Sequence, residues 1–348
     1  MVNQFEAELN EDVYVDADVL RTKKSTFSGH ASLLQADEVT CSHMIGRGDS
    51  GIVYKGTYRG SIVVEKRMHM SVAKPSESME KSLEIVASRM SSLRHPNTVL
   101  FMGVCLRDQE FCIVSEYCSR GSLYDILHSK QHRHGSGRPV AADVNEKETD
   151  LHWSLRCRLA LGAARGLLFL HSASPPLVHA QLTSANILVD DSWNAKLADF
   201  GTRKVSQAVS ATTTKPKDKG GRLPYWSAPE VLKNGEAAEL TGENPQGVDV
   251  YSFGIVLWEL ATGEIPFANL ATYAELRSYV LSGQRPSIKA GACPMAWTEL
   301  MAKCWSNKPQ RRPSAAEIVT LLEAMSQTEP MMQKKSPSSR KKKRRSKK

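Results

Sequence analysis

A glycine-rich segment near residue 50 has the composition of a phosphate-binding loop. Gly46, Gly48 and Gly51 follow a short apolar run, and the absence of side chains lets backbone N–H groups approach phosphate oxygens closely. The same G-x-G-x-x-G spacing occurs in ordinary hairpins and at dinucleotide-binding turns. A dinucleotide turn opens directly into a helix, whereas here strand-like residues continue over 52–58. The segment is therefore predicted to be a hairpin.

Lys66 is the first charged residue that could act together with this loop, and it lies twenty residues after Gly46. Alternation with a period of two places Val64 and Lys66 on one face of a strand and Val63 and Glu65 on the other. We expect Val64 to line an adenine pocket and Lys66 to bind phosphate. A single lysine at a strand end is more often a solvated surface charge. Its spacing after the glycine loop favours the functional interpretation.

The elements that must position these residues fall into two groups. From about residue 37 to 114 the chain contains short β-like runs broken by glycine, with one helical stretch over 76–93. From residue 121 onward, helical spacing dominates. This pattern predicts an α+β fold with a small antiparallel β lobe that carries one helix and a larger, mainly α-helical lobe. Helices of the second lobe are expected over Trp153–His171, Asp249–Thr262, Thr272–Ser282, Pro294–Cys304 and Ala315–Met325.

Composition indicates a globular chain with a basic tail. The 348 residues are 41% hydrophobic, enough for a substantial core. The formal charge of +9 comes from Lys334–Lys348, which carries ten Lys and Arg residues and leaves 36 basic against 37 acidic residues elsewhere. Such a run cannot pack. It fits a nuclear import signal and nonspecific contact with acidic lipid or nucleic acid equally well.

Cysteine usage and hydropathy predict the compartment. The seven cysteines form no C-x-x-C pair and no set with zinc spacing, which is typical of reduced thiols in the cytosol or nucleus. The first residues are acidic where a secretory signal is basic. No run approaches the roughly 20 apolar residues of a membrane span. We expect a soluble protein of the cytoplasm, with the nucleus as a second location.

Several motifs, in order from about residue 38 to 326, resemble the protein kinases. Residues 179–186 (HAQLTSAN) resemble the catalytic-loop signature H-R-D-L-x-x-x-N, and LADFG at 197–201 resembles the segment that carries a magnesium ligand. The segment 93–103 (LRHPNTVLFMG) resembles the tyrosine-kinase-like group of serine/threonine kinases, which includes Raf and mixed-lineage kinases. The resemblance implies the two-lobed kinase fold, with ATP, Mg²⁺ or Mn²⁺ and a protein partner or substrate.

This resemblance also implies domain limits. We expect a mobile N-terminal extension over 1–36, a kinase-like domain over 37–326 and a disordered basic tail over 327–348. Within the domain we expect an N-lobe at about 37–114, a hinge at about 115–120, a C-lobe at about 121–326 and a polar insert at 129–150.

The resemblance assigns roles to further residues. Ser115 would bound the back of the adenine pocket, and Glu116 and Cys118 would offer backbone hydrogen bonds to the base. Asn186 and Asp199 match the two magnesium ligands, since Mg²⁺ prefers hard oxygen donors. The expected nucleotide-binding residues are Ile45, Gly46, Gly48, Gly51, Val53, Val64, Lys66, Ser115, Glu116, Cys118 and Leu188, the last as the pocket floor.

Two further matches have structural roles. Glu230, in the segment SAPE, would pair with Arg312. Asp249 would brace the catalytic loop from a buried helix. These matches support the fold and do not bear on activity.

The catalytic-loop match departs from the family at the position that matters most for chemistry. Gln181 stands where the family has an aspartate that accepts the proton of the substrate hydroxyl, and a neutral amide cannot take up that proton. Thr183 and Leu223 replace the lysine and threonine that serine/threonine kinases pair with this aspartate. Ala180 replaces the arginine that binds an activation-loop phosphate, so phosphorylation within Ser210–Thr214 would lack its usual counter-charge.

A fifth departure concerns the partner of the strand lysine. Active kinases pair this lysine with a glutamate nine residues before the position of His95, and that position is Val86. Glu84 lies roughly 200° away around an ideal helix. It could pair with Lys66 only if the helix were bulged or shifted.

These departures predict an ATP-binding protein of the kinase fold that is a pseudokinase or a strongly impaired kinase. It would act in signal transduction as a nucleotide-responsive scaffold or regulator of a partner kinase. The alternative is an active serine/threonine kinase that transfers the ATP γ-phosphate to protein substrates, because Lys66, Asn186 and Asp199 are retained. A minor alternative, indicated by the segments 95–105 and 119–127, is a module related to the kinase-homology region of receptor guanylyl cyclases.

Overall fold

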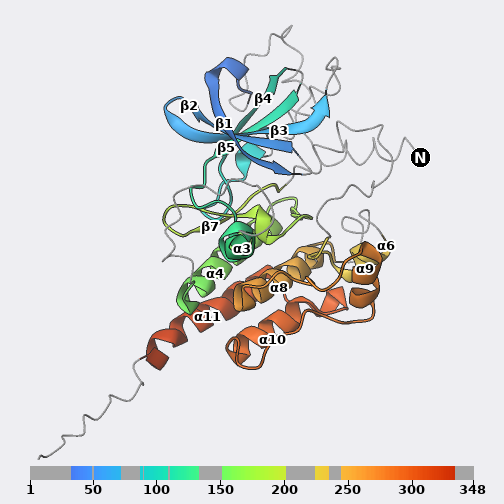
Figure 1. The fold of residues 1–348 in the computed structure, drawn as a ribbon. Helices are drawn as coiled ribbons and strands as arrows, with labels where there is room; N and C mark the ends of the chain where they lie inside the picture. Colours follow the sequence, from blue (N-terminus) through green and yellow to red (C-terminus); the bar gives the residue numbers. More distant parts are fainter. Residues whose placement is uncertain are drawn as a thin grey trace, which may run out of the picture.

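The N-terminal lobe is built on a five-stranded antiparallel sheet with the strand order β1-β2-β3-β5-β4 (Figure 1). The computed structural model describes residues 33–48, 51–71, 87–88, 90–108, 110–132, 151–200, 224–234 and 244–333. The strands are β1 (Val39–Gly48), β2 (Gly51–Tyr58), β3 (Ser61–Ser71), β4 (Phe101–Arg107) and β5 (Glu110–Glu116).

The glycine segment forms the hairpin predicted from the sequence. β1 and β2 pair antiparallel, with Gly46 opposite Val53 and Gly48 opposite Gly51. A side chain at Gly51 could not be accommodated, because an added Cβ atom would lie 2.1 Å from the carbonyl oxygen of Arg67 on β3. Glycine at this position therefore allows β2 to lie close against β3.

Only the end of the helix expected over 76–93 falls within the described residues. Residues 87–88 and 90–92 are helical. Ala87 and Met90 are buried against β3, β4 and β5, where they contact a cluster that includes Phe101 and Phe111. This end of the helix therefore lies on one face of the sheet. The remainder of the predicted helix, with Glu84 and Val86, lies outside the described residues.

The C-terminal lobe is mainly helical, as predicted. A two-stranded sheet, β6 (Ile187–Val189) and β7 (Ala195–Leu197), lies on the side facing the N-lobe (Figure 1). The helices are α3 (Leu123–His132), α4 (Trp153–His171), α6 (Pro229–Asn234), α8 (Gln246–Thr262), α9 (Tyr273–Leu281), α10 (Met295–Cys304) and α11 (Ala315–Gln333). Short 3₁₀ turns are η1 (Ala36–Glu38), η3 (Ser184–Asn186) and η4 (Pro309–Arg311). None of the helices in the described ranges is long and apolar enough to cross a membrane.

Helix limits follow local signals where these exist. α4 spans the predicted residues, and α9 begins after Thr272, whose hydroxyl accepts a hydrogen bond from the N–H of Glu275 in a capping box. α8 ends at Gly263, which has a φ of 69°, a left-handed conformation that glycine adopts without steric cost.

Some limits differ from those expected. α11 continues to Gln333, past residue 326, where the kinase-like domain was expected to end. α3 includes residues 129–132, so the first part of the expected polar insert is helical. The N-terminal extension through residue 32, the insert residues 133–150, the segment 201–223 and the tail from residue 334 lie outside the described residues.

The core of the C-lobe is organised around α8. Every residue from Gly247 to Ala261 is buried, because α4, α10 and the segment that carries α6 all pack against this helix. Arg312 joins this core to α6, as predicted. Its guanidinium donates to both carboxylate oxygens of Glu230, at 2.5 and 2.8 Å, and to the carbonyl of Gly247 at 2.8 Å.

Replacement of Arg312 tests this connection. The side chain is fully buried, so Arg312→Gln would leave the Glu230 carboxylate and buried carbonyls without their donor. We expect the free energy of unfolding in urea to fall by about 2 to 3 kcal/mol. Arg311→Gln is the matched control, because Arg311 is exposed, and it should change stability by less than about 0.5 kcal/mol. Equal effects of the two substitutions would contradict a structural role for the pair.

Candidate active site

An ion pair between the lobes brings together two residues from the sequence analysis. Lys66 Nζ, from β3, lies 2.5 Å from Asp199 Oδ2, just after β7, and the two side chains are 12% and 26% exposed. Val63 and Glu65, on the opposite face of β3, are fully buried. Val63 and Glu65 therefore lie on one face of β3 and Lys66 lies on the other, as predicted. Lys66 faces the C-lobe.

The catalytic-loop segment is held by Asp249 of α8, as predicted. One carboxylate oxygen of Asp249 accepts the N–H of Ala180 at 2.8 Å, and the other accepts the N–H of His179 at 2.8 Å and His171 Nε2 at 2.9 Å. Ala180 has a φ of 64°, in the left-handed region that is unfavourable for alanine. The buried carboxylate stabilises a backbone conformation that this sequence would not adopt alone.

Asn186 and Asp199 are connected through the backbone. The side-chain amide of Asn186 donates to the carbonyl of Gln181 at 2.7 Å, and the carbonyl of Asn186 accepts the N–H of Ala198 at 2.8 Å. Asp199 has a φ of 63°, a second left-handed residue. Because its Nδ2 atom is engaged within the loop, Asn186 presents Oδ1 as its ligand atom.

This donor set fits a magnesium ion. The Asn186 Oδ1 atom and the Asp199 carboxylate are hard oxygen ligands, and Mg²⁺ takes few protein ligands together with phosphate oxygens. In the family, the ion neutralises charge on the β- and γ-phosphates. Asp199 also contacts Lys66, so a phosphate bound by the lysine would lie next to these oxygen ligands.

Gln181 lies on the same loop. The residue is exposed, its carbonyl accepts the Asn186 amide, and its N–H lies 3.4 Å from His179 Nδ1. Its backbone carbonyl therefore fixes the side chain of Asn186, one of the two predicted metal ligands. Its side chain ends in a carboxamide, which accepts hydrogen bonds but is not a base at neutral pH.

The hinge residues follow β5 directly. Ser115 lies opposite Val64 of β3 in the sheet register. Cys118 is buried, and burial raises the pKa of its thiol to about 12, so the side chain is neutral. Leu188 of β6 forms an isolated bridge with Ser122, just after the hinge. These contacts place the predicted floor residue next to the chain segment predicted to bind adenine.

The glycine hairpin contributes the remaining predicted residues. Val53 of β2 lies opposite both Gly46 and Lys66 in the two registers, and Ile45 is 37% exposed. An added Cβ at Gly48 would meet nothing within 4 Å. Packing within the described protein therefore does not require a glycine at position 48, and the space in front of it is available to a ligand.

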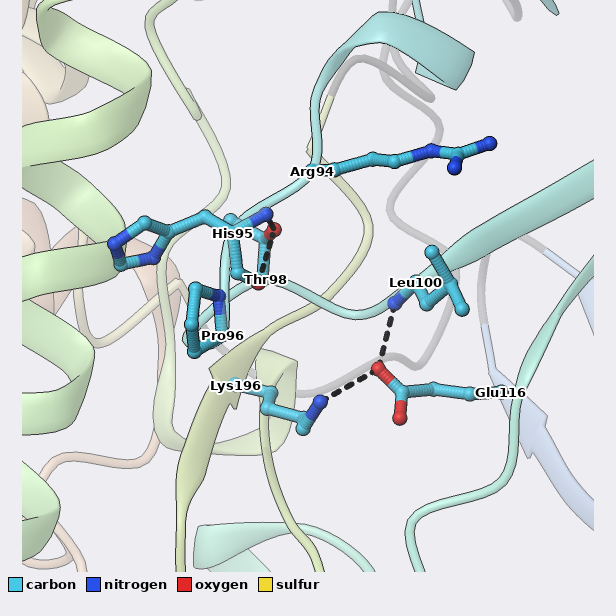
Figure 2. A pocket seen from close by; sticks show the side chains of 7 residues that line it. All are labelled: Arg94, His95, Pro96, Thr98, Leu100, Glu116 and Lys196. Atoms are coloured by element: carbon cyan, nitrogen blue, oxygen red, sulfur yellow. Dashed lines mark hydrogen bonds and ion pairs between the residues drawn. The ribbon is translucent and has the colours of Figure 1, made fainter.

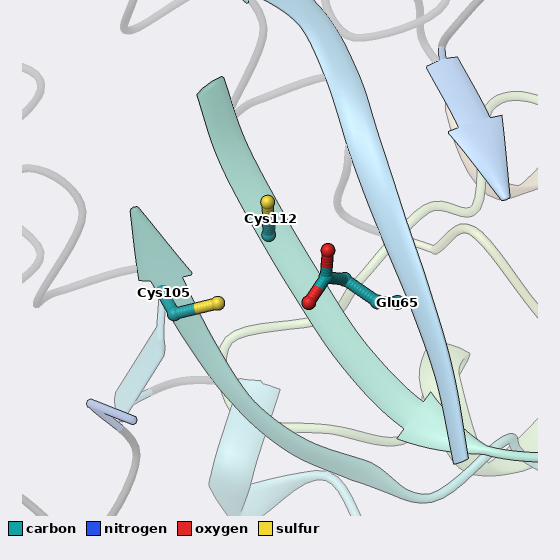
Figure 3. A group of neighbouring side chains, drawn as sticks. All are labelled: Glu65, Cys105 and Cys112. Carbon is teal, nitrogen blue, oxygen red and sulfur yellow. The ribbon is translucent and has the colours of Figure 1, made fainter. Parts of the chain in front are cut away.

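A second cluster on the opposite face of the sheet has the composition of a metal site. The ligand atoms of Glu65, Cys105 and Cys112 lie within 4.8 Å of one another, and all three residues are buried (Figure 3). However, Glu65 accepts hydrogen bonds from Arg67 at 2.8 Å and from Arg107 at 3.0 Å. Two guanidinium groups occupy its carboxylate and repel a cation, so we assign the cluster to structure. Arg107 also donates to the carbonyls of Ala36 and Val39, which fastens the chain before β1 to the sheet.

Sequence reasoning missed two side chains in this region. Glu65 was assigned only to a strand face, although it is a fully buried charge. Glu116 was assigned a backbone role, whereas its side chain pairs with Lys196 at 2.8 Å. The apolar Val63, on the same face of the strand as Glu65, could have indicated the first. Some residues that depart from the family pattern lie together on the catalytic-loop segment, namely Ala180, Gln181 and Thr183. Others, namely Val86 and Leu223, lie outside the described residues, as does Glu84.

Comparison with known proteins agrees with this geometry. The two lobes, the hinge between them and the paired lysine and aspartate define the class of protein kinase folds. Residues 39–322 match the family model described as protein tyrosine and serine/threonine kinase, and the chain therefore belongs to that family.

Curated relatives carry serine/threonine kinase names. The chain is 33% identical to the "Probable serine/threonine-protein kinase drkA" of Dictyostelium discoideum, over 81% of this chain and 39% of that protein. It is 33% identical to drkB, over 84% of this chain and 38% of that protein. It is 37% identical to drkD, over 83% of this chain and 20% of that protein. The chain thus spans less than two fifths of the length of these relatives.

Stability should depend on the protonation of His179. Burial lowers the pKa of this imidazole below its ordinary value of 6.5, although the carboxylates of Asp249 and Asp199 act in the opposite direction. Below pH 6.5 the unfolded chain therefore binds a proton that the folded protein does not, so the stabilisation is complete above pH 6.5 and is lost on acidification. We expect the free energy of unfolding in urea to fall between about pH 7 and about pH 5.

The variant His179→Asn isolates this contribution. It cannot take up the proton, so its stability should depend less steeply on pH over the same range. An unchanged slope would assign the dependence to other groups.

Proposed function

We propose that the chain is an ATP-binding pseudokinase, or a strongly impaired kinase, of the tyrosine-kinase-like group, which acts as a nucleotide-responsive regulator of a protein partner. The observation that carries this proposal is Gln181. Its backbone takes part in the loop that supports Asn186, while its side chain supplies a carboxamide where a proton acceptor is needed. The architecture for nucleotide binding is thus retained without the general base.

Neighbouring residues support the same conclusion. Ala180 occupies the position of the phosphate-binding arginine and Thr183 that of the catalytic lysine, on a loop whose backbone is otherwise held in place by Asp249. A methyl group cannot bind an activation-loop phosphate. A threonine hydroxyl carries no charge to stabilise the transferring phosphoryl group.

Nucleotide binding is supported by the groups that remain. Lys66 supplies a cation for phosphate, and Asn186 and Asp199 supply the oxygen ligands for Mg²⁺. The hinge offers backbone groups at Glu116 and Cys118 for the adenine base. These contacts bind and orient ATP without requiring a proton acceptor, so binding and transfer are separable.

The rival function is an active serine/threonine kinase, favoured by the same Lys66–Asp199 pair and by the names of the Dictyostelium relatives. A positioned general base contributes ~10²- to 10⁴-fold in rate, or about 3 to 5 kcal/mol of barrier. Most of the catalysis of phosphoryl transfer comes from positioning and charge neutralisation. Loss of the base alone therefore predicts slow transfer, and the additional departures predict turnover lower still.

A phosphotransfer assay distinguishes the two functions. Purified protein is incubated with radiolabelled ATP, Mg²⁺ or Mn²⁺ and a generic protein substrate, beside Asp199→Ala and Gln181→Asp. We expect the unaltered chain to give little or no more labelled product than Asp199→Ala, because the unaltered chain lacks the general base and the variant lacks a metal ligand. Rapid transfer that Asp199→Ala abolishes would refute the proposal and establish the rival.

The Gln181→Asp variant measures how complete the rest of the site is. If only the base is missing, restoring a carboxylate should raise the rate by ~10²-fold or more. If Ala180 and Thr183 also prevent transfer, the rate should not rise. Gln181→Asn provides the matched control, because it shortens the side chain as aspartate does without adding a charge.

Nucleotide binding is tested separately by thermal unfolding. ATP with Mg²⁺ at about 100 times its dissociation constant should stabilise the fold by roughly 2.7 kcal/mol. Lys66→Met and Asp199→Ala should each reduce this stabilisation, because they remove a phosphate and a metal contact. The absence of any shift in the unaltered chain would limit the function to a nucleotide-independent scaffold.

A further inference from the structure

A second ion pair joins the lobes at the hinge. Lys196 Nζ, from β7 of the C-lobe, donates to Glu116 Oε1, at the end of β5, over 2.8 Å. The same oxygen accepts the backbone N–H of Leu100 at 2.7 Å. Figure 2 shows the carboxylate of Glu116 between these two donors. Three chain segments therefore meet at one carboxylate oxygen. Glu116 and Lys196 also line a pocket of about 340 Å³.

Both members of this pair are next to groups predicted to hold adenine. Glu116 follows Ser115 and carries the first backbone group of the predicted base-binding hinge. Lys196 lies directly opposite Leu188, the predicted floor of the pocket, in the β6–β7 register. Lys196 also lies three residues before Asp199. A side-chain bond thus connects the hinge to the strand that leads to the metal ligand.

The segment before β4 completes the connection through its backbone. Val99 N–H donates to the carbonyl of Leu197 at 2.8 Å, and Leu197 N–H donates to the carbonyl of Asn97 at 2.9 Å. On the other side, Glu116 N–H donates to the carbonyl of Leu100 at 3.0 Å. The segment is therefore bonded to both β7 and the hinge. The Lys196–Glu116 ion pair links β7 directly to the hinge, so each of the three segments is bonded to the other two.

Partial burial makes this contact stronger than a surface ion pair. The side chains of Lys196 and Glu116 are 14% and 24% exposed, whereas Lys289 and Glu264, 3.6 Å apart, are 89% and 53% exposed. Solvent screens the second pair far more effectively. Removing the Glu116 charge would also weaken the acceptor of the Leu100 N–H. Cys118 lies close enough for both charges to influence the pKa of its thiol.

We propose that Glu116 and Lys196 form a latch that positions the hinge for adenine, which makes them positioning residues for the nucleotide. This inference rests on the proposed ATP-binding function. The latch holds the backbone groups of Glu116 and Cys118 at a set position relative to Leu188. When it opens, the hinge can move relative to the floor of the pocket, and the base loses its aligned hydrogen bonds, while the phosphate-binding Lys66 and the metal ligand Asp199 are unaffected.

Calorimetric titration with two ligands tests this assignment. The variants are Glu116→Gln, Lys196→Met and the double variant, with Lys289→Met as the control for loss of an exposed lysine. We expect each single variant to bind Mg-ATP roughly tenfold more weakly, which corresponds to about 1.4 kcal/mol. Binding of Mg-tripolyphosphate, measured directly or by competition with ATP, should stay within about twofold of the unaltered chain, because that ligand has no base. Equal weakening of the binding of both ligands would show a general structural effect and would overturn the assignment to the adenine end of the site.

The double variant tests whether the two residues act together. If they form one latch, the double variant should bind Mg-ATP about as weakly as either single variant, since the contact is lost only once. Effects that multiply to roughly a hundredfold would show independent roles and overturn the latch. Single variants that bind Mg-ATP like the unaltered chain would also overturn it.

Hydrogen exchange separates failure of the latch from failure of the proposed function. Without nucleotide, Glu116→Gln and Lys196→Met should increase amide exchange at Leu100 and at residues 115–118, and Lys289→Met should not. If the unaltered chain binds no ATP, the nucleotide function is wrong, and the assignment of the latch as a hinge-positioning contact is decided by exchange alone. Unchanged exchange in both variants would contradict it.

Discussion

The organisation of the candidate site depends on one buried carboxylate. Asp249 lies on α8, the most deeply buried helix of the C-lobe, and binds two consecutive backbone N–H groups of the catalytic-loop segment. It holds Ala180 in a left-handed conformation that alanine avoids elsewhere. Since the loop then returns through Gln181 to Asn186, the position of a magnesium ligand follows from a contact made in the core.

This arrangement explains how the loop keeps its form with a carboxamide at position 181. The contacts that shape it are made by the backbone of His179, Ala180 and Gln181, and they are independent of the side chains at positions 180 and 181. A carboxamide in place of a carboxylate therefore leaves Asn186 and Asp199, the predicted metal ligands, undisturbed. In the proposed function, nucleotide binding would depend on the backbone carbonyl of Gln181, which supports Asn186, whereas phosphate transfer would depend on the side chain at the same position.

The sequence predicted much of the fold because the relevant signals are local. Apolar periodicity located α4 to the residue, and glycine spacing located the β1–β2 hairpin. The pairings of Glu230 with Arg312 and of Asp249 with the loop were predicted from the family resemblance, and both are present. These pairings are defined by motif positions that a single sequence displays.

What the sequence could not predict are contacts between side chains that are distant in the chain. Glu65 and Arg107 are 42 residues apart, and Glu116 and Lys196 are 80 apart. Neither pair belongs to a motif, and a charged residue in a strand is ordinarily assigned to solvent. The limit of α11 was also missed, since the helix continues through Pro330 to Gln333, although a proline ordinarily ends a helix at the residue before it. Only the three-dimensional arrangement reveals which charges meet.

The Lys66–Asp199 and Glu116–Lys196 ion pairs, which join the lobes within the described residues, differ in what a nucleotide would do to them. A ligand shifts a conformational equilibrium only by its difference in affinity for the two states. Phosphate would compete with Asp199 for Lys66, whereas adenine would use the hinge that Glu116 and Lys196 hold in place. The first contact is therefore exchanged on binding and the second is retained. The proposed response to ATP without phosphate transfer would use this combination, because the retained contact would keep the base-binding surface constant while the exchanged one would allow the lobes to move.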